Sequence, residues 1–190
     1  MIPVLPVAVG LGLALLVGRR RGAADTGSGA EGDPGSSQLG LPVAAALAPA
    51  LQASLFGDWL YYWGGPSPMN PAGLVYGVPF AGPVRGDCSG AARALLISAG
   101  LAPLTLERFT SASLPSSPSF VAVASPEPGD LLLYDGHVTV CVGGSGDGCT
   151  VWSMSGGGPS TKGDNPNAKP KLFSGARYRK DYRGAYRLRR

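Results

Sequence analysis

The chain has 190 residues, of which only 15% are charged, whereas glycine (30 residues) and proline (18) are abundant. This length suffices for one domain with extensions, and the composition argues against a helical bundle and for short elements joined by many loops. The net charge of +4 is unevenly spread, because residues 177–190 alone contribute +6 and the rest of the chain about −2.

The first segment is apolar. Residues 2–17 carry no charge, and three arginines follow at 19–21. Sixteen helical residues span ~24 Å, and Met1 and Gly18 bring the segment closer to the ~30 Å of a bilayer core. We therefore predict a transmembrane helix over 1–18. A cleaved secretion signal is one alternative, although its positive charge normally precedes the apolar run. A buried or interfacial segment is another.

Residues 19–40 consist mainly of glycine, alanine, serine and acidic residues, a composition typical of a flexible tether. The globular domain is predicted over 41–176, and 177–190 is predicted as a basic C-terminal strand and tail. This segment is either a solvated strand with its tail or a contact for an anionic lipid, polymer or nucleic acid. No aromatic-basic motif supports RNA binding in particular.

Two helices are predicted in the domain. Apolar residues at helical spacing between 41 and 60 indicate a helix that ends near Gly57, followed by a Pro/Gly-rich loop to residue 86. An Ala/Leu-rich helix is predicted over 90–99, with Asp87 as its N-cap and Gly100 at its end. Residues 101–127 are predicted to be a connection with one short helical turn near 104–109.

The apolar period then changes to two, which is typical of strands. Strands are predicted over 130–134, 137–142 and 149–154, with a final one within 176–188, and the Asp135-Gly136 pair is predicted to join the first two. Helices followed by a strand meander indicate an α+β fold, with the helices packed on one face of an antiparallel sheet.

Cys88 and His137 are the candidate catalytic pair, and His137 is the only histidine of the chain. A cysteine at a helix N-terminus is expected to have a lowered pKa, and the N–H groups after it can stabilise an oxyanion. His137, at the start of a strand, could face this helix across the core and act as base. The alternatives are an inert core cysteine and a structural histidine.

The other two cysteines, Cys141 and Cys149, are expected to pack within the strand pair or to bridge across it. No metal site or cofactor is expected, because one histidine and three cysteines lack paired ligand spacing. The glycines at 156–158 do not form a phosphate loop, since no Lys-Ser/Thr pair follows them.

Five segments in order resemble the NlpC-type family of cell-wall cysteine peptidases, which have a papain-like arrangement. Tyr61-Tyr-Trp-Gly-Gly is similar to the family's Y-x-W-G-G, and Asp87-Cys-Ser-Gly to its D-C-S-G nucleophile motif. The Gly100–Pro103 region matches G-x-x-L-P loosely. The Pro128-Gly-Asp-Leu and His137-Val segments match P-G-D-L and H-V-x-x-x-x-G. The resemblance covers roughly residues 43–156.

The resemblance implies a papain-like fold and cleavage of peptidoglycan stem peptides, often at the γ-D-glutamyl–diamino acid bond. It implies Cys88 as nucleophile, His137 as base and then acid, and Tyr61 near the oxyanion. The residue that orients the histidine is usually His, Asn or Gln, and its place here is occupied by Ser153. A serine hydroxyl reaches less far and carries no charge, so the alternative is a catalytically weak or inactive wall-binding or structural module. A related amidase or acyltransferase is a third possibility.

The expected partners are peptidoglycan, the membrane through the N-terminal helix, and other virion or envelope proteins. The arginines at 19–21 favour a cytoplasmic location for the residues that follow them, whereas the wall lies outside. Delivery within a membrane-containing virus particle, as a lysin for wall penetration, would resolve this conflict. So would a short helix that does not follow the charge rule.

Overall fold

The computed structural model describes residues 43–63, 73–156, 163–165 and 168–189. The predicted transmembrane helix over 1–18 and the tether over 19–40 lie outside these ranges. Within them, no helix combines the length and the apolar character needed to cross a bilayer. All the described residues belong to a single compact unit.

Both predicted helices are present. Helix α1 spans Val43–Phe56 and is followed by Gly57, and helix α2 spans Cys88–Ser98. Every residue of α2 is buried, so this helix is the centre of the domain rather than a surface element.

The ends of α2 follow the local sequence. At the start, Asp87 Oδ1 accepts a hydrogen bond from the Gly90 N–H at 2.8 Å, as expected of an N-cap. At the end, Gly100 has a φ of +72°. The Gly100 and Leu101 N–H groups donate to Ile97 and Leu96 carbonyls at 2.9 Å each. This is the Schellman arrangement that a glycine after the last turn permits.

The strand meander forms a six-stranded sheet in which the neighbouring strands are antiparallel, with the order β3-β9-β4-β5-β6-β8. Gly136, with a φ of +67°, makes the tight turn between β4 and β5. The strand bounds are Phe120–Val123 (β3), Leu131–Tyr134 (β4), His137–Gly143 (β5), Thr150–Met154 (β6), Pro170–Ser174 (β8) and Tyr182–Leu188 (β9).

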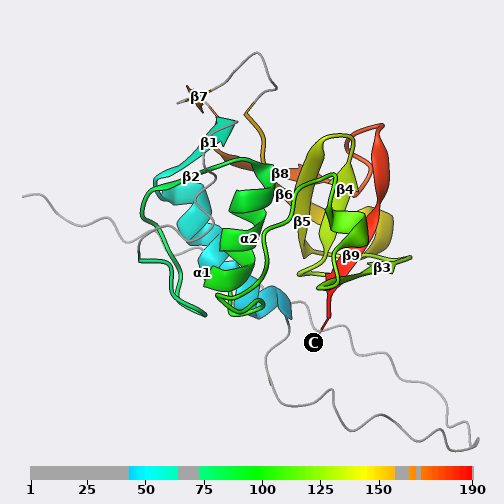
Figure 1. Cartoon of the computed structure of the whole chain (residues 1–190), viewed down its shortest axis with the longest axis horizontal. Helices are drawn as coiled ribbons and strands as arrows, with labels where there is room; N and C mark the ends of the chain where they lie inside the picture. The colour runs from blue at the N-terminus through cyan, green and yellow to red at the C-terminus, as the bar shows by residue number, and fades with distance from the viewer. Residues whose placement is uncertain (1–42, 64–72, 157–162, 166–167, 190) are drawn as a thin grey trace, which may run out of the picture. The chain divides into compact units, whose positions relative to one another are not determined.

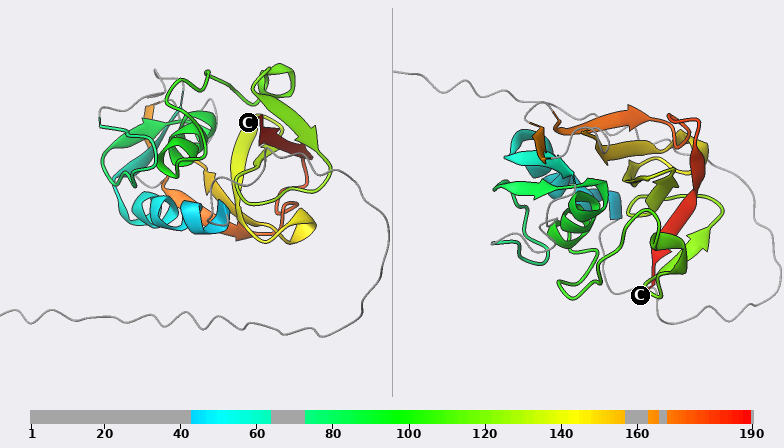
Figure 2. Two further views of the ribbon diagram at one scale, coloured as in Figure 1. Left: turned by 90° about the horizontal axis from the view of Figure 1, so that it is seen from below. Right: turned by 45° about the horizontal axis from the view of Figure 1, so that its top comes forward.

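Each face of this sheet has its own hydrophobic core. Val138, Val140 and Val142 of β5 pack with residues of both helices, and Figures 1 and 2 show both helices on one side of the sheet. Cys141 belongs to a second cluster with residues of β4, β6 and β9. The α+β class with helices on one face of an antiparallel sheet is thus confirmed.

The alternation along β5 also places His137. It lies on the face that carries Tyr134, at 6.3 Å between ring centroids, and not on the face of the three valines. Successive side chains of a strand point to opposite faces. The His137 ring therefore does not approach α2 across the helix-packed core, and this corrects our expectation. Instead, the start of α2 lies near the N-terminal end of β5, where Val138 follows His137.

A second, three-stranded sheet has the order β2-β1-β7, and it differs from the loop predicted up to residue 86. Strand β1 (Trp59–Trp63) pairs in parallel with β2 (Val84–Gly86) and antiparallel with β7 (Gly163–Asn165). Two of its strands are only three residues long, and their partners are distant in the chain, so local periodicity gave no signal for them.

The helical turn predicted near residues 104–109 is absent there, and a 3₁₀ turn occurs at Leu114–Ser116 instead. The reason is Arg93, a buried side chain of α2, whose guanidinium donates to the carbonyls of Leu104 (2.6 Å) and Leu106 (2.8 Å). These carbonyls satisfy a buried charge of the preceding helix.

The basic segment 177–190 contains strand β9, which lies between β3 and β4. Two of its arginines form bidentate ion pairs: Arg183 with Asp135 at 2.6 and 2.7 Å, and Arg187 with Asp130 at 2.9 and 2.8 Å. Part of the positive charge is therefore neutralised within the domain, and a contact with an anionic lipid or polymer stays a prediction.

Candidate active site around Cys88 and His137

Cys88 is the first residue of α2, and the Asp87 side chain organises the turn that holds it. Asp87 Oδ1 accepts from the Gly90 N–H and from Ser89 Oγ, both at 2.8 Å. The thiol thus lies at a capped helix N-terminus, where unpaired N–H groups are concentrated. Only 7% of the residue is exposed.

The pKa of Cys88 is not lowered, and this corrects the sequence-based expectation. The pKa of the thiol is raised to about 11, mainly by burial and in part by the Asp87 carboxylate. The backbone N–H groups of Val138, Ser89 and Cys88 itself lower it, but by less. Loss of solvation disfavours the thiolate more than the helix terminus favours it, so the group is a neutral thiol at pH 7.

The effect of the Val138 N–H on the pKa of Cys88 indicates which strand lies near the thiol. Val138 follows His137 in β5, so the sulfur lies against the backbone at the N-terminal end of that strand. The negative charge of Asp87 acts on both residues, since it raises the pKa of Cys88 and that of His137. Cys88 and His137 therefore both lie near the Asp87 carboxylate.

His137 is held through one nitrogen of its ring. Nε2 lies 2.8 Å from Ser153 Oγ and 3.3 Å from Ser155 Oγ. Nδ1 has no hydrogen bond to the described residues, so it is the ring nitrogen left to accept a proton. Ser153 thus occupies the predicted place beside the histidine, and its hydroxyl reaches the ring.

The pKa of His137 is lowered to about 4, mainly by burial and in part by the nearby Arg179 guanidinium. The carboxylates of Asp181 and Asp87 raise it in part. The imidazole is consequently neutral at pH 7, and only 6% of the residue is exposed. A neutral thiol beside a neutral imidazole can transfer its proton when sulfur attacks a carbonyl, which is general-base activation of a nucleophile.

Tyr61 also belongs to this site. Burial raises the pKa of its hydroxyl, and the next causes are the charges of Cys88 and Asp87, which places the phenol near the sulfur. Its ring packs directly on Gly156, where an added Cβ would lie 2.0 Å from Tyr61 Cγ. Gly156 is therefore required for the position of this ring.

Two neighbours of the site were not predicted from the sequence. Ser155 contacts Ser153 Oγ at 2.6 Å, and the Tyr178 hydroxyl donates to the same oxygen at 3.4 Å. The period of two in β6 could have indicated Ser155, because it shares a face with Ser153. Tyr178 lies in the turn between β8 and β9, and no local pattern pointed to it.

The remaining cysteines are remote from this chemistry. Cys141 and Cys149 are free, fully buried members of the second core cluster. Their thiols lie 3.6 Å from the Gly143 carbonyl and 3.8 Å from the Pro126 carbonyl, respectively. Among the described residues, no group of three His, Cys, Asp or Glu side chains is arranged to hold a metal ion.

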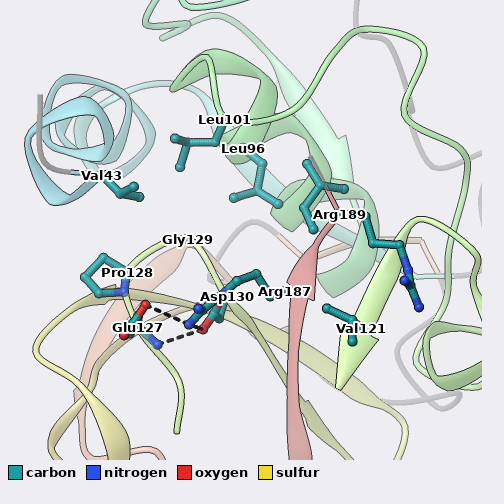
Figure 3. A pocket seen from close by; sticks show the side chains of 11 residues that line it. Val43, Leu96, Leu101, Val121, Glu127, Pro128, Gly129, Asp130, Arg187 and Arg189 are labelled. Atoms are coloured by element: carbon teal, nitrogen blue, oxygen red, sulfur yellow. Dashed lines mark hydrogen bonds and ion pairs between the residues drawn. The ribbon is translucent and has the colours of Figure 1, made fainter. Parts of the chain in front are cut away.

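A cavity of about 510 Å³ lies elsewhere, and its lining includes neither Cys88 nor His137 (Figure 3). On one side it has the Pro128–Asp130 turn, where Asp130 Oδ2 accepts from the Glu127 N–H (2.7 Å) and from Arg187. This motif segment therefore stabilises a turn and a strand pairing. The lining residues are Val43, Leu96, Leu101, Val121, Glu127, Pro128, Gly129, Asp130, Arg187, Leu188 and Arg189.

Comparisons of this chain with protein-family models, with curated proteins and with solved structures give no match.

Proposed function

We propose that this chain is a papain-like cysteine peptidase of the NlpC type that cleaves peptidoglycan stem peptides. The observation that supports it best is the site itself: a thiol at a capped helix N-terminus, against the strand whose first residue is the only histidine. The order of the sequence motifs supports the choice of peptidoglycan and of the γ-D-glutamyl–diamino acid bond.

In the proposed reaction, Cys88 sulfur attacks the scissile carbonyl while its proton passes to Nδ1 of His137. The Cys88 N–H and the Tyr61 hydroxyl stabilise the oxyanion. Collapse breaks the C–N bond, and the imidazolium returns the proton to the leaving amine, which gives a thioester. Water, deprotonated by His137, then hydrolyses the thioester and restores the thiol. Because both groups start neutral, proton transfer accompanies the attack and no preformed ion pair is needed.

We further propose that the domain is tethered to a membrane by residues 1–18 through the linker 19–40, in a virion or in a cell envelope. The motivation is the uncharged run before three arginines. Fractionation of cells that express the full chain tests this proposal. Recovery of the full chain in the alkali-washed membrane fraction is expected, and its release by the wash would contradict the anchor.

The test of the activity is digestion of purified sacculi by the full chain, followed by mass spectrometry of the products. Soluble muropeptides are expected from the wild type and from Cys141→Ala, which removes a thiol outside the site. None is expected from Cys88→Ala or His137→Ala. Equal release by Cys88→Ala would reject the peptidase, and products cut at another bond would indicate an amidase or acyltransferase.

A second candidate is a wall-binding module without turnover. It is favoured by the pKa of Cys88, which burial raises to about 11, and by a serine in place of the usual orienting residue. This module would sediment with sacculi without releasing fragments, and the Cys88→Ala variant would sediment equally well.

A further inference from the structure

The hydroxyl groups of Ser153 and Ser155 lie near Nε2 of His137, and the Tyr178 hydroxyl donates to Ser153. We call these three residues the hydroxyl cluster. Ser153 Oγ is its centre: it lies 2.8 Å from Nε2, 2.6 Å from Ser155 Oγ and 3.4 Å from the Tyr178 hydroxyl that donates to it. Ser153 is fully buried, whereas Ser155 is exposed.

The direction of these hydrogen bonds decides whether His137 can act as a base. A serine hydroxyl has one proton to donate and two lone pairs to accept with. If Ser153 donates to Nε2, the neutral ring carries its proton on Nδ1 and cannot accept another there. If Ser153 accepts from an Nε2–H, then Nδ1 is free.

The geometry of the cluster favours the second arrangement. Ser155 Oγ, at 2.6 Å, is the nearest acceptor for the Ser153 proton, and Tyr178 donates into one Ser153 lone pair. The other lone pair then faces Nε2. Ser155 Oγ also lies 3.3 Å from Nε2, but Ser155 is exposed, so its hydroxyl can donate to water instead.

We propose that Ser155 and Tyr178 are positioning residues that make Ser153 an acceptor, which fixes the proton of His137 on Nε2 and leaves Nδ1 as the base. In catalytic terms this rests on the proposed peptidase function. In the family that the sequence resembles, a single amide or imidazole orients the histidine. Here the three neutral hydroxyl groups of the cluster would orient it.

Tyr178 is held by contacts that do not involve its hydroxyl. Its ring stacks on Phe173 with centroids 4.4 Å apart and meets the Tyr134 ring edge at 5.3 Å. Tyr178→Phe should therefore keep the fold. Tyr182→Phe is a matched control, because its ring also meets Tyr134, at 5.6 Å, but it has no hydrogen bond to the cluster.

The charged groups around the ring do not obscure the measurement. Arg179 and Asp181, from the turn between β8 and β9, are paired with each other at 2.6 and 2.9 Å, and Asp87 comes from the start of α2. Because the pKa of His137 is about 4, the ring is neutral at pH 7 with or without any of the variants, and only its tautomer changes.

The test is ¹⁵N NMR of the full chain labelled in histidine, which gives one ring because the chain has one histidine. At pH 7 the wild type, Ser155→Thr and Tyr182→Phe are expected to carry the proton on Nε2. Ser155→Ala should shift the tautomer ratio by about fivefold toward Nδ1–H, the effect of one ordinary hydrogen bond, and Tyr178→Phe should shift it in the same direction. A wild type protonated on Nδ1, or an unchanged ratio in Ser155→Ala, would overturn the proposal.

Kinetic measurements distinguish the positioning role of Ser155 and Tyr178 from the proposed peptidase activity. On sacculi, Ser155→Ala should lower kcat in proportion to the fraction of His137 that loses the Nε2–H tautomer, by at most about fivefold, while KM is unchanged and Ser155→Thr restores kcat. If the tautomer responds as expected but no variant hydrolyses sacculi, the positioning role stands and the peptidase fails. If the wild type hydrolyses sacculi but the tautomer does not respond, the peptidase stands and the positioning role fails.

Discussion

Acidification should destabilise this protein through His137. The ring is buried and neutral in the folded state, where its pKa falls from 6.5 to about 4, whereas the unfolded chain exposes it to water. Between these two pH values the unfolded chain binds the proton more tightly. The stability that depends on a neutral ring is thus fully present above pH 6.5 and is lost as the pH falls toward 4.

The size of the effect follows from the two pKa values. The interval from 6.5 to about 4, at about 1.4 kcal/mol for each pH unit, corresponds at its full extent to about 3.5 kcal/mol of unfolding free energy. This is a large part of the ~5–15 kcal/mol by which most domains are stable. Solvent screens the interactions of this ring very little, because only 6% of the residue is exposed.

Urea unfolding of the wild type and of His137→Gln at a series of pH values measures this effect. Glutamine does not titrate, and its amide can still donate to Ser153. Carboxylates titrate in both proteins and cancel in the difference. The gap between the two unfolding free energies should change by about 3 kcal/mol between pH 6.5 and 4, to the disadvantage of the wild type. Parallel pH profiles would refute the argument that burial keeps this ring neutral.

Three further predictions concern the same region. Iodoacetamide alkylation of Cys88 can be followed by peptide mapping. Its rate should rise about tenfold for each pH unit above 7 and level off only near the thiol pKa of about 11. A rate that is already maximal at pH 7 would contradict the raised pKa. Asp87→Ala should lower the unfolding free energy in urea by ~1 kcal/mol through loss of the cap, whereas Asp87→Asn keeps the cap and, by removing a negative charge, lowers the pKa of Cys88. Equal destabilisation by the two would show that the charge and not the cap matters. Gly156→Ala should cost ~1–3 kcal/mol in the same assay, because its Cβ would lie 2.0 Å from Tyr61 Cγ, whereas Gly148→Ala, with open space around the added atom, should be near neutral.

Several elements could be predicted from sequence because their causes are local. The helix that begins at Cys88 is preceded by an aspartate whose carboxylate accepts from the N–H of the residue three positions later. The helix ends before a glycine, which can adopt a positive φ. The β4–β5 hairpin follows from the alternation of its strands and the Asp135-Gly136 turn. In each case the interacting atoms are a few residues apart.

Other elements could not be predicted because their partners are distant in the chain. The three residues of β2 form a strand only because Trp59–Trp63 lies beside them, and strand β8 depends on β6 in the same way. The carbonyls of residues 104 and 106 are taken by Arg93, an interaction that no local pattern reveals.

In the candidate site, too, some features follow from the local sequence and others depend on tertiary contacts. The sequence by itself determined the candidate residues, namely a cysteine at a helix start, a single histidine opening a strand, and a serine predicted beside it. Only the tertiary structure decided their ionisation and their partners. Packing around α2 removes water from the thiol and raises its pKa, and the β8–β9 turn brings the Tyr178 hydroxyl to Ser153. Solvation and contacts of this kind depend on everything that surrounds a group in space, so they arise only when the whole chain has folded.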